Sequence, residues 1–359
     1  MKKIQITPAW SFTDEAGNRL DPQLFGLLSA VHQSGKLTAA AAELGISYRH
    51  AWNLLNKWAD FFGVALVDMQ KGRGAWLSPL GEKLLWAEQR VAARLGPQLE
   101  SLGSELNLEI QQLLEGVKPV LRLHASHGYA VALLPRFAQD LQLDLQYCSP
   151  QEALAALNRG ACDLAGFHVP TAAISGPLMK NYRRLLKPRS HRIIRFITRN
   201  QGLMIKPDNP HGIEGLADLL RSDVRFINRQ KDSGTRALLD GLLRDAKLSV
   251  RKIRGYELEE YTHSAVAAYI AAGMADAGFG VEAAARQFGL GFVPLATEHY
   301  LFVCHRQALN DPKLQRLIDL VSSEAFKSAV AALPGYSPSQ CGEVCGIDEL
   351  FDAATGTQG

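Results

Sequence analysis

The chain has 359 residues, of which 47% are hydrophobic and 21% charged, so it is neither a disordered nor a fibrous protein, and its length fits two or three globular domains. Its formal net charge of only +3 excludes a polycation, so affinity for nucleic acid has to come from locally placed charge. No window reaches the roughly 18 apolar residues of a membrane span, and no signal-peptide core follows Met1. The five cysteines, an odd number, argue against a disulfide framework, and we expect a cytoplasmic protein.

The segment from Leu24 to Gly81 is predicted to fold as a winged helix-turn-helix. Apolar residues at helical spacing indicate a first helix that ends at Gly35, and these residues are Leu24, Leu27, Leu28 and Val31. Thr38 is expected as the N-cap of a short second helix. Gly45 then supplies the tight turn that a helix-turn-helix needs between its two helices.

The next helix is predicted from Tyr48 to Phe61 or Phe62, with Ser47 as its N-cap. Helical spacing turns four apolar side chains inward, namely Ala51, Leu54, Leu55 and Trp58. The side chains left on the outer face can donate to base edges and phosphates, as expected of a recognition helix in the major groove.

Two short strands, residues 65–67 and 75–77, enclose a basic, glycine-rich tip that carries Lys71 and Arg73, and such a wing touches backbone phosphates. A long amphipathic helix follows from about residue 80 to residue 114, and Pro97 is expected to kink or interrupt it because proline removes a backbone donor. The candidate DNA-binding residues are therefore Thr38, Ser47, Tyr48, Arg49, His50, Trp52, Asn53, Lys57, Lys71 and Arg73. The alternative is a domain that binds only protein, with Arg49 and Lys57 as solvated charges and Trp52 in the core.

This segment resembles the N-terminal domain of the molybdate-responsive ModE regulators and, more distantly, of LysR-type regulators. The matching pieces are "LTAAAAELGISYRHAWNLLNKW", the wing "KGRGAWLSPLGEKLL" and the long helix behind it. The resemblance covers about the first 115 residues. It implies a homodimer joined through the long helices that binds an inverted repeat in operator DNA.

From Pro119 onward, strands and helices alternate, which predicts a mainly parallel sheet with helices on both faces. The segment "RIIRFITRNQGLMI" is expected to supply two of the strands. One stretch, residues 178–206, holds nine lysines and arginines and no acidic residue, and it is interpreted as a solvated region rather than as a second electrostatic surface.

Polar turns follow three of the strands, where an open α/β sheet binds its ligand. The first holds Ser126 and His127, the second runs from Asn228 to Arg236, and the third precedes the helix that begins near His263. Backbone amides at a helix N-terminus and the planar fork of Arg236 suit an anion. Helix capping alone explains any single turn, whereas three at one sheet edge favour a ligand site.

The segments "GACDLAGFHVP", "FINRQKDSGTRALLD" and "YTHSAVAAYIAAGMADAGFGVEAAA" resemble a periplasmic-binding-protein-like domain. The resemblance runs from about Val120 to Leu333 and implies two lobes with a ligand in the cleft between them. The residues expected to bind the ligand are Ser126, His127, His168, Ser233, Gly234, Thr235, Arg236, Thr262 and His263. The three histidines do not have the spacing of a metal motif, and the pair Cys341 and Cys345 is a weak metal signal, so neither a metal nor a cofactor is expected.

Together these patterns predict an α/β protein with an all-α winged helix-turn-helix (residues 1–82), a linker and dimerisation helix (83–117), a two-lobed effector domain (118–340) and a C-terminal tail (341–359). The hypothesis is a transcription regulator, a homodimer or homotetramer, that binds operator DNA and senses a small anionic effector. ModE regulators carry small β-barrel domains for molybdate, which this chain lacks. The ligand therefore stays open among molybdate or tungstate, a compound related to the molybdenum cofactor, and a carboxylate such as formate. The alternative is an enzyme or binding protein for a molybdopterin-related compound, although no nucleophile–base pair is evident.

Overall fold

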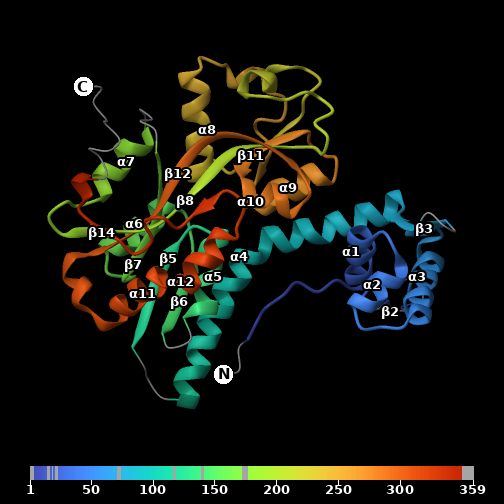
Figure 1. Cartoon of the computed structure of the whole chain (residues 1–359), viewed down its shortest axis with the longest axis horizontal. Helices are drawn as coiled ribbons and strands as arrows, with labels where there is room; N and C mark the ends of the chain where they lie inside the picture. Colours follow the sequence, from blue (N-terminus) through green and yellow to red (C-terminus); the bar gives the residue numbers. More distant parts are fainter. Residues whose placement is uncertain are drawn as a thin grey trace. The chain divides into compact units, whose positions relative to one another are not determined.

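The computed structural model describes residues 4–13, 17, 19–20, 23–70, 74–115, 119–138, 141–171 and 177–349. The chain forms two compact units, residues 7–95 and residues 1–6 with 96–359 (Figure 1). The boundary falls inside the long helix α4 (Pro79–Glu115) and not at the end of the wing. None of the helices in the described ranges is long and apolar enough to cross a membrane.

The unit of residues 7–95 is a helix-turn-helix with a two-stranded wing, as predicted. Its elements before α4 are β1 (Phe12–Thr13), β2 (Arg19–Leu20), α1 (Leu24–Ser34), α2 (Leu37–Glu43), α3 (Tyr48–Phe62), β3 (Val67–Gln70) and β4 (Gly74–Leu77). Every side chain predicted to point inward from α1 and α3 is buried, with Trp58 at the centre. Gly35 and Gly45 adopt the left-handed conformation at the ends of α1 and α2, with φ of 65° and 66°, which glycine adopts without strain.

Three local predictions in this unit need correction. Thr38 is not an N-cap, because α2 begins at Leu37 and Lys36 occupies the cap position without a side-chain bond. The wing strands lie slightly nearer the tip than predicted, because β3 and β4 pair from Val67↔Leu77 to Gln70↔Gly74. Pro97 does not interrupt α4, which continues through it to Glu115.

The second unit is a mixed α/β domain whose main sheet has the strand order β10-β9-β11-β8-β12-β7-β5-β6. Its first half contains β5 (Val120–Ala125), α5 (Tyr129–Phe137), β6 (Gln142–Tyr147), α6 (Pro150–Asn158), β7 (Leu164–Pro170), α7 (Pro177–Leu185) and β8 (His191–Ile205). Its second half contains β9 (Phe226–Arg229), α8 (Gly234–Asp245), β10 (Glu259–Glu260), α9 (His263–Ala271), β11 (Ala277–Val281), α10 (Glu282–Gln287), β12 (Gly291–His305), α11 (Pro312–Ser322), α12 (Glu324–Ala331), β13 (Tyr336–Ser337) and β14 (Val344–Cys345). Short 3₁₀ helices lie at Leu216–Leu220, Val250–Lys252 and Arg306–Asn310.

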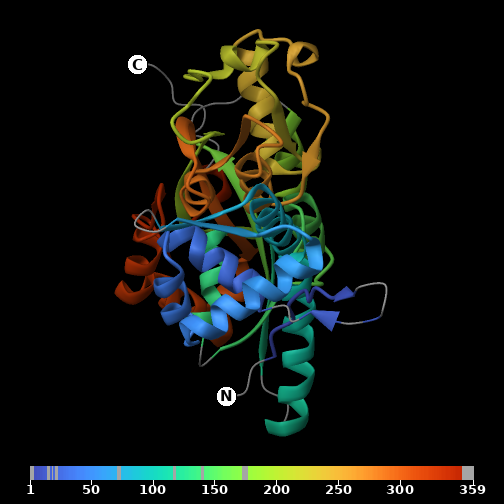
Figure 2. The same ribbon diagram turned by 90° about the vertical axis from the view of Figure 1, so that its right-hand side faces the viewer.

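The domain has two lobes, and two long antiparallel strands, β8 and β12, run through both of them (Figure 1). In the first lobe, β7 pairs with residues 298–304 of β12, and β5 and β6 continue the sheet in parallel. In the second lobe, β11 pairs with residues 201–205 of β8, and β9 and β10 continue it in parallel. Figure 2 shows the second-lobe segments drawn in yellow at one end of the domain, as in Figure 1. Both β8 and β12 therefore pass from one lobe to the other.

The segment predicted as two strands is the single strand β8, which corrects the sequence interpretation. Gly202, three residues before the end of this strand, continues the ladder opposite Pro294, and a Cβ at this position would clash with Val293 O. Glycine here permits close approach of β12 and does not mark a turn.

The C-terminal half of α4 covers the edge strand β6. The Oγ of Ser104 accepts a hydrogen bond from Leu145 N, and the Oγ of Ser101 accepts one from Tyr147 N, each at 3.0 Å. These backbone donors face away from the sheet because β6 is its last strand. The two serines therefore supply acceptors for backbone N–H groups at the edge of the sheet, and these hydrogen bonds hold residues 101–104 against the domain.

Residues 341–349 pack on the domain, so the tail boundary expected at residue 341 is too early. Strand β14 pairs with Ile193 and Ile194 of β8, and both Cys341 and Ile347 are buried. The remainder of the expected tail, residues 350–359, lies outside the described residues.

Candidate DNA-binding face and effector site

The outer face of α3 presents the side chains that the sequence predicted. Ser47 caps the helix by accepting a hydrogen bond from His50 N at 3.1 Å. The six outward-facing residues of the prediction are all exposed, namely Tyr48, Arg49, His50, Trp52, Asn53 and Lys57. Trp52 is 39% exposed, so it is not a core residue. Thr38 is exposed in the first turn of α2, and Lys71 and Arg73 lie outside the described residues.

The effector domain has a buried ion pair where its two long strands pass between the lobes. Arg199 and Glu298 lie opposite each other in the β8–β12 ladder, and Arg199 Nε donates to Glu298 Oε1 at 2.6 Å. Gln201 Nε2 donates to the same oxygen at 2.7 Å. Both charged side chains are at most 2% exposed. Burial alone would lower the pKa of Arg199, but Glu298 raises it above the ordinary value.

The first lobe brings two histidines to this ion pair. His168 is buried in β7, and its Nδ1 lies 3.2 Å from Arg199 Nη2. His127 follows β5, and its ring meets the edge of Tyr147 at a centroid distance of 5.0 Å. A Cβ at Gly128 would lie 3.2 Å from Arg199 Nη1, so this glycine leaves room for the guanidinium.

The second lobe adds Arg229, Thr235 and His263. Thr235 Oγ1 lies 3.5 Å from both His263 Nε2 and Gln201 Nε2. Arg229, at the end of β9, donates from Nη2 to Tyr261 O at 3.0 Å. We call Arg199, Arg229, His127, His168 and His263 the Arg–His cluster; its members come from both lobes and from the strands between them.

The electrostatics of the Arg–His cluster favour an anion. The pKa of Arg229 is lowered to about 9, mainly because the side chain is buried and also because Arg199 is positively charged. Burial is the main cause that lowers the pKa values of the three histidines, and the charges of the two arginines add to it. The pKa of His127 is about 4, and those of His168 and His263 lie well below the ordinary value. At neutral pH the arginines are charged and the imidazoles are neutral. Because Glu298 already compensates Arg199, an added negative charge would chiefly stabilise the charged form of Arg229.

Several buried polar atoms at this place have no hydrogen-bond partner among the described residues. They include Ser126 Oγ, Gln201 Oε1 and His263 Nδ1, whereas the Arg199 guanidinium also interacts with the Tyr336 hydroxyl. A buried polar group without a partner costs about 1–3 kcal/mol. Such a group in a folded protein needs an explanation, and a bound ligand is one.

The other predicted ligand residues have different positions. Ser233 and Thr262 cap α8 and α9 by accepting hydrogen bonds from Arg236 N and Ala265 N. Gly234 lies against His168, since a Cβ there would come within 3.2 Å of the ring. Ser233 and Thr262 therefore act as helix caps, and Gly234 permits the close approach of His168.

Arg236, which was predicted to bind the ligand, makes its contacts within the second lobe, where its Nη1 donates to the backbone oxygen of Arg229 at 3.2 Å. Its Nε donates to Asp240 Oδ1 at 3.1 Å, its Nη1 contacts Glu259, and its guanidinium lies 4.1 Å from the centroid of the Tyr256 ring. Residues of the second lobe therefore hold the Arg236 guanidinium in place.

Sequence reasoning missed Arg199, Gln201 and Glu298, and it placed Arg229 in a candidate polar turn without counting it among the ligand residues. A charged residue in the middle of the apolar run from Ile193 to Ile205 was the available signal for Arg199. No comparable signal marks Glu298, because its partner is 99 residues away. Among the residues with described positions, no group of three or more histidine, cysteine or acidic side chains is arranged to hold a metal ion.

Comparison with known proteins agrees with this division of the chain. Residues 132–322 match the PBP superfamily domain, and residues 23–82 match the bacterial regulatory helix-turn-helix proteins of the lysR family. Over 202 residues the chain is 32% identical to the uncharacterized protein YvgK of Bacillus subtilis, which covers 55% of this chain and 64% of that protein.

A second relative is the molybdenum-pterin-binding protein MopB of Rhodobacter capsulatus, 30% identical over 132 residues, covering 36% of this chain and 48% of that protein. The chain thus spans about half to two thirds of the length of these relatives. Among solved structures, a mutant OxyR of Corynebacterium glutamicum aligns with 86% of this chain and 93% of its own, at 16% identity and a TM-score of 0.45. The PBP superfamily match extends over more than half of the residues, so the chain belongs to that family and carries a lysR-family helix-turn-helix domain before it.

Proposed function

We propose that the protein is a transcription regulator that binds operator DNA through α3 and the wing and binds a small oxyanion at the Arg–His cluster. The observation that carries the effector half of the proposal is the group of buried, unpartnered atoms beside two buried arginines. The lysR-family match at residues 23–82 and the exposed polar face of α3 support the DNA half. The proposed response is a change in operator affinity when the oxyanion binds.

A tetrahedral oxyanion suits the donors available at the cluster. Arg199 and Arg229 supply positive charge, and the neutral imidazole of His263 can donate from Nδ1. Donors from both lobes surround one place, as needed for a compact anion with several oxygens. The name of MopB refers to molybdenum, so molybdate and tungstate are the first ligands to test. Formate and compounds related to the molybdenum cofactor follow.

Tyr147 gives the site a route to the linker helix. Its ring contacts His127 of the cluster, and its backbone N–H donates to Ser101 of α4. The same helix continues without a break to Pro79, directly after the wing. Regulation requires that the oxyanion bind two arrangements of the domain with different affinity. We propose that these arrangements differ in how α4 is held.

An apolar stripe on α4 supports the proposed homodimer. Four large side chains one turn apart are exposed, namely Leu102, Leu106, Ile110 and Leu113. Exposed apolar residues at this spacing favour a helix–helix contact. A symmetric dimer would place two recognition helices on an inverted repeat, and a further contact between effector domains would give a tetramer.

The test is thermal melting of the full-length chain with molybdate, tungstate, sulfate, phosphate and formate. A ligand that binds only the folded state raises the melting temperature with its concentration. Burial already disfavours the charged form of Arg229, so Arg229→Gln should keep the unliganded stability while losing the ligand-induced rise.

Lys231→Gln is the matched control. It removes one positive charge two residues further along the chain, and the Lys231 side chain is 72% exposed. It should melt and respond like the wild type. No rise with any of the anions, or an undiminished rise in Arg229→Gln, would contradict the proposed effector site.

A further inference from the structure

Helix α3 exposes two aromatic side chains that its own domain leaves largely uncovered. Tyr48 is 50% exposed and Trp52 is 39% exposed, and their rings stack with a centroid distance of 6.4 Å and an interplanar angle of 24°. The remaining aromatic residues of this helix, Trp58, Phe61 and Phe62, contact one another in the hydrophobic core. The exposed pair is therefore not explained by the packing of the helix.

The pair lies at the N-terminal end of α3, next to polar side chains. Tyr48 is the first residue of the helix after the Ser47 cap, and Trp52 lies one turn later. Arg49 and Asn53 occupy the adjacent positions one turn apart and are exposed. In a helix-turn-helix, the N-terminal residues of the recognition helix reach the base edges. This half of α3 thus offers a donor strip and an apolar strip side by side.

The major groove has one prominent apolar group on its base edges, the C5-methyl of thymine. Charged and amide side chains at Arg49 and Asn53 can hydrogen-bond to bases, but they gain little from a methyl group. A large apolar side chain that covers the methyl group removes apolar surface from water, which favours binding. We propose that Tyr48 and Trp52 read thymine methyl groups in the operator. This inference rests on the proposed DNA-binding function and adds a base preference to it.

The test begins by selecting binding sites for the full-length protein from random duplex DNA. Each thymine of the selected site is then replaced singly by deoxyuridine, which lacks only the methyl group, and affinity is measured by fluorescence anisotropy at fixed salt. The wild type should lose about fourfold in affinity at particular thymines, the amount expected for one buried carbon group. Trp52→Gln should lose the preference for thymine over uracil at one or more of these positions, and any preference that remains is expected from Tyr48.

Two further variants make the result decisive. Trp76→Gln removes a tryptophan that is 44% exposed on β4 of the same domain, and it should keep the thymine preference. Trp52→Phe keeps an apolar ring and should retain part of the preference even if Trp52→Gln does not fold, which circular dichroism will reveal.

Three outcomes would overturn the inference. The wild type could bind its site tightly and ignore every methyl group, or Trp52→Gln could keep the full preference. Trp52→Gln could also lose affinity for all DNA while the wild type ignores the methyl groups, which would place the pair against the sugar–phosphate backbone. Failure to select any DNA sequence would instead defeat the DNA-binding function itself, and the first step of the experiment separates that case.

Discussion

Arg199 and Glu298 face each other across the β8–β12 ladder at the point where both strands leave one lobe for the other. The residues before Arg199 pair within the first lobe, and those after it pair with β11 of the second. The ion pair therefore lies between two otherwise separate strand systems, at the centre of the Arg–His cluster. Its chemistry should affect the stability of the domain and, if the proposed function holds, the binding of an anion.

Replacing Glu298 with glutamine should destabilise the unliganded protein and strengthen oxyanion binding. Removing one partner of a buried ion pair costs about 3–5 kcal/mol, since the other charge remains buried. A bound oxyanion would then compensate Arg199 in place of the carboxylate. Urea denaturation with and without molybdate measures both effects. Glu343→Gln is the control, because that carboxylate is 59% exposed and 4.0 Å from Arg195. Equal stability of Glu298→Gln and wild type would contradict the assignment.

Removing the serine hydroxyls that α4 offers to β6 should loosen the linker helix. Ser101→Ala with Ser104→Ala takes away the acceptors for Leu145 N and Tyr147 N, and each lost hydrogen bond costs about 1 kcal/mol. We also expect a weaker effect of the oxyanion on operator affinity. Glu105→Ala, an exposed change on the same helix, is the control. An unchanged response in the double variant would show that this contact does not carry the signal.

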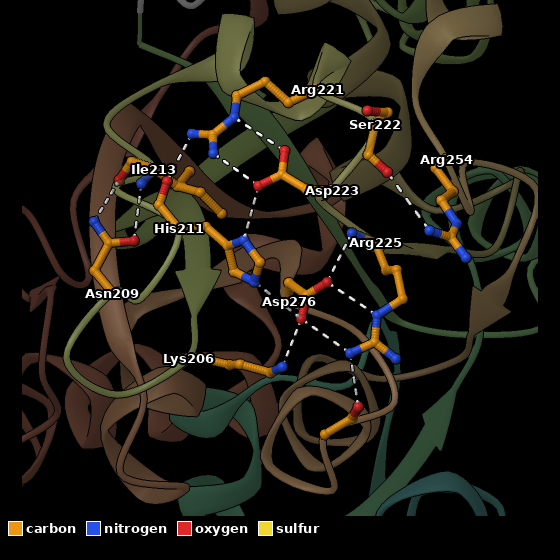
Figure 3. Close-up of polar contacts among 11 residues, drawn as sticks. Lys206, Asn209, His211, Ile213, Arg221, Ser222, Asp223, Arg225, Arg254 and Asp276 are labelled. Carbon is orange, nitrogen blue, oxygen red and sulfur yellow. Dashed lines mark hydrogen bonds and ion pairs between the residues drawn. The ribbon is translucent and has the colours of Figure 1, made fainter.

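Asp276 should dominate the acid sensitivity of the second lobe. Figure 3 shows its carboxylate between Lys206, Arg225 and His211, with distances of 2.5 Å, 2.9 Å and 3.5 Å to their nitrogens. Burial alone would raise the pKa of Asp276, but hydrogen bonds from Arg225 and Lys206 hold it below the usual range. Because the folded-state pKa is depressed, the stabilisation is present above the unfolded value of 3.8 and is lost as the pH falls below it.

Asp276→Asn should therefore lower the free energy of unfolding at pH 7, by less than for a fully buried ion pair, because the Lys206 and Arg225 side chains left behind are 26% and 38% exposed. The variant should also lose less stability on acidification than the wild type. Urea denaturation between pH 7 and pH 3 measures this. Asp223→Asn, an exposed neighbour in the same network, should change the profile much less. Parallel pH profiles for wild type and Asp276→Asn would refute the prediction.

His127 should make the protein less stable in mild acid. Burial, then Arg229 and Arg199, lowers its pKa from 6.5 to about 4. Between these values the unfolded chain takes up a proton that the folded chain does not, so stability falls as the pH drops from about 6.5 to about 4. His127→Gln should flatten this part of the profile, whereas His50→Gln on the exposed face of α3 should not. An unaltered slope in His127→Gln would mean that the ring is accessible to protons in the folded state.

The helix-turn-helix could be predicted from sequence because its signals are local. Gly35 and Gly45 end their helices in the left-handed conformation, and Ser47 caps the helix that follows it. The strands and helices between Val120 and Val281 were mostly predicted as well, because the alternation is local, whereas β12, α11 and α12 were not predicted. The length of β8 was not predicted. Two strands were expected there, but a single strand continues through Gly202, and glycine is needed at this position because β12 approaches closely.

The candidate site was only partly predictable. His127 and His263 were selected because they lie in polar turns near buried strands, whereas His168 lies within the strand β7, and the structure brings the three together. Arg199 and Glu298 were missed because only the register of two distant strands makes them partners. Arg236 was chosen for its charge, but its guanidinium contacts Asp240 and Tyr256, and sequence does not give the direction of a side chain.

The most direct test of the account is the affinity of the full-length protein for a selected operator as molybdate is titrated, with sulfate as a parallel titration. Ionic strength is held constant, because protein–DNA affinity depends steeply on salt. We expect molybdate to change the operator affinity of the wild type and of Lys231→Gln, and we expect Arg229→Gln to keep the basal affinity but no longer respond. Operator affinity that is indifferent to molybdate, or an Arg229→Gln variant that responds like the wild type, would contradict this expectation.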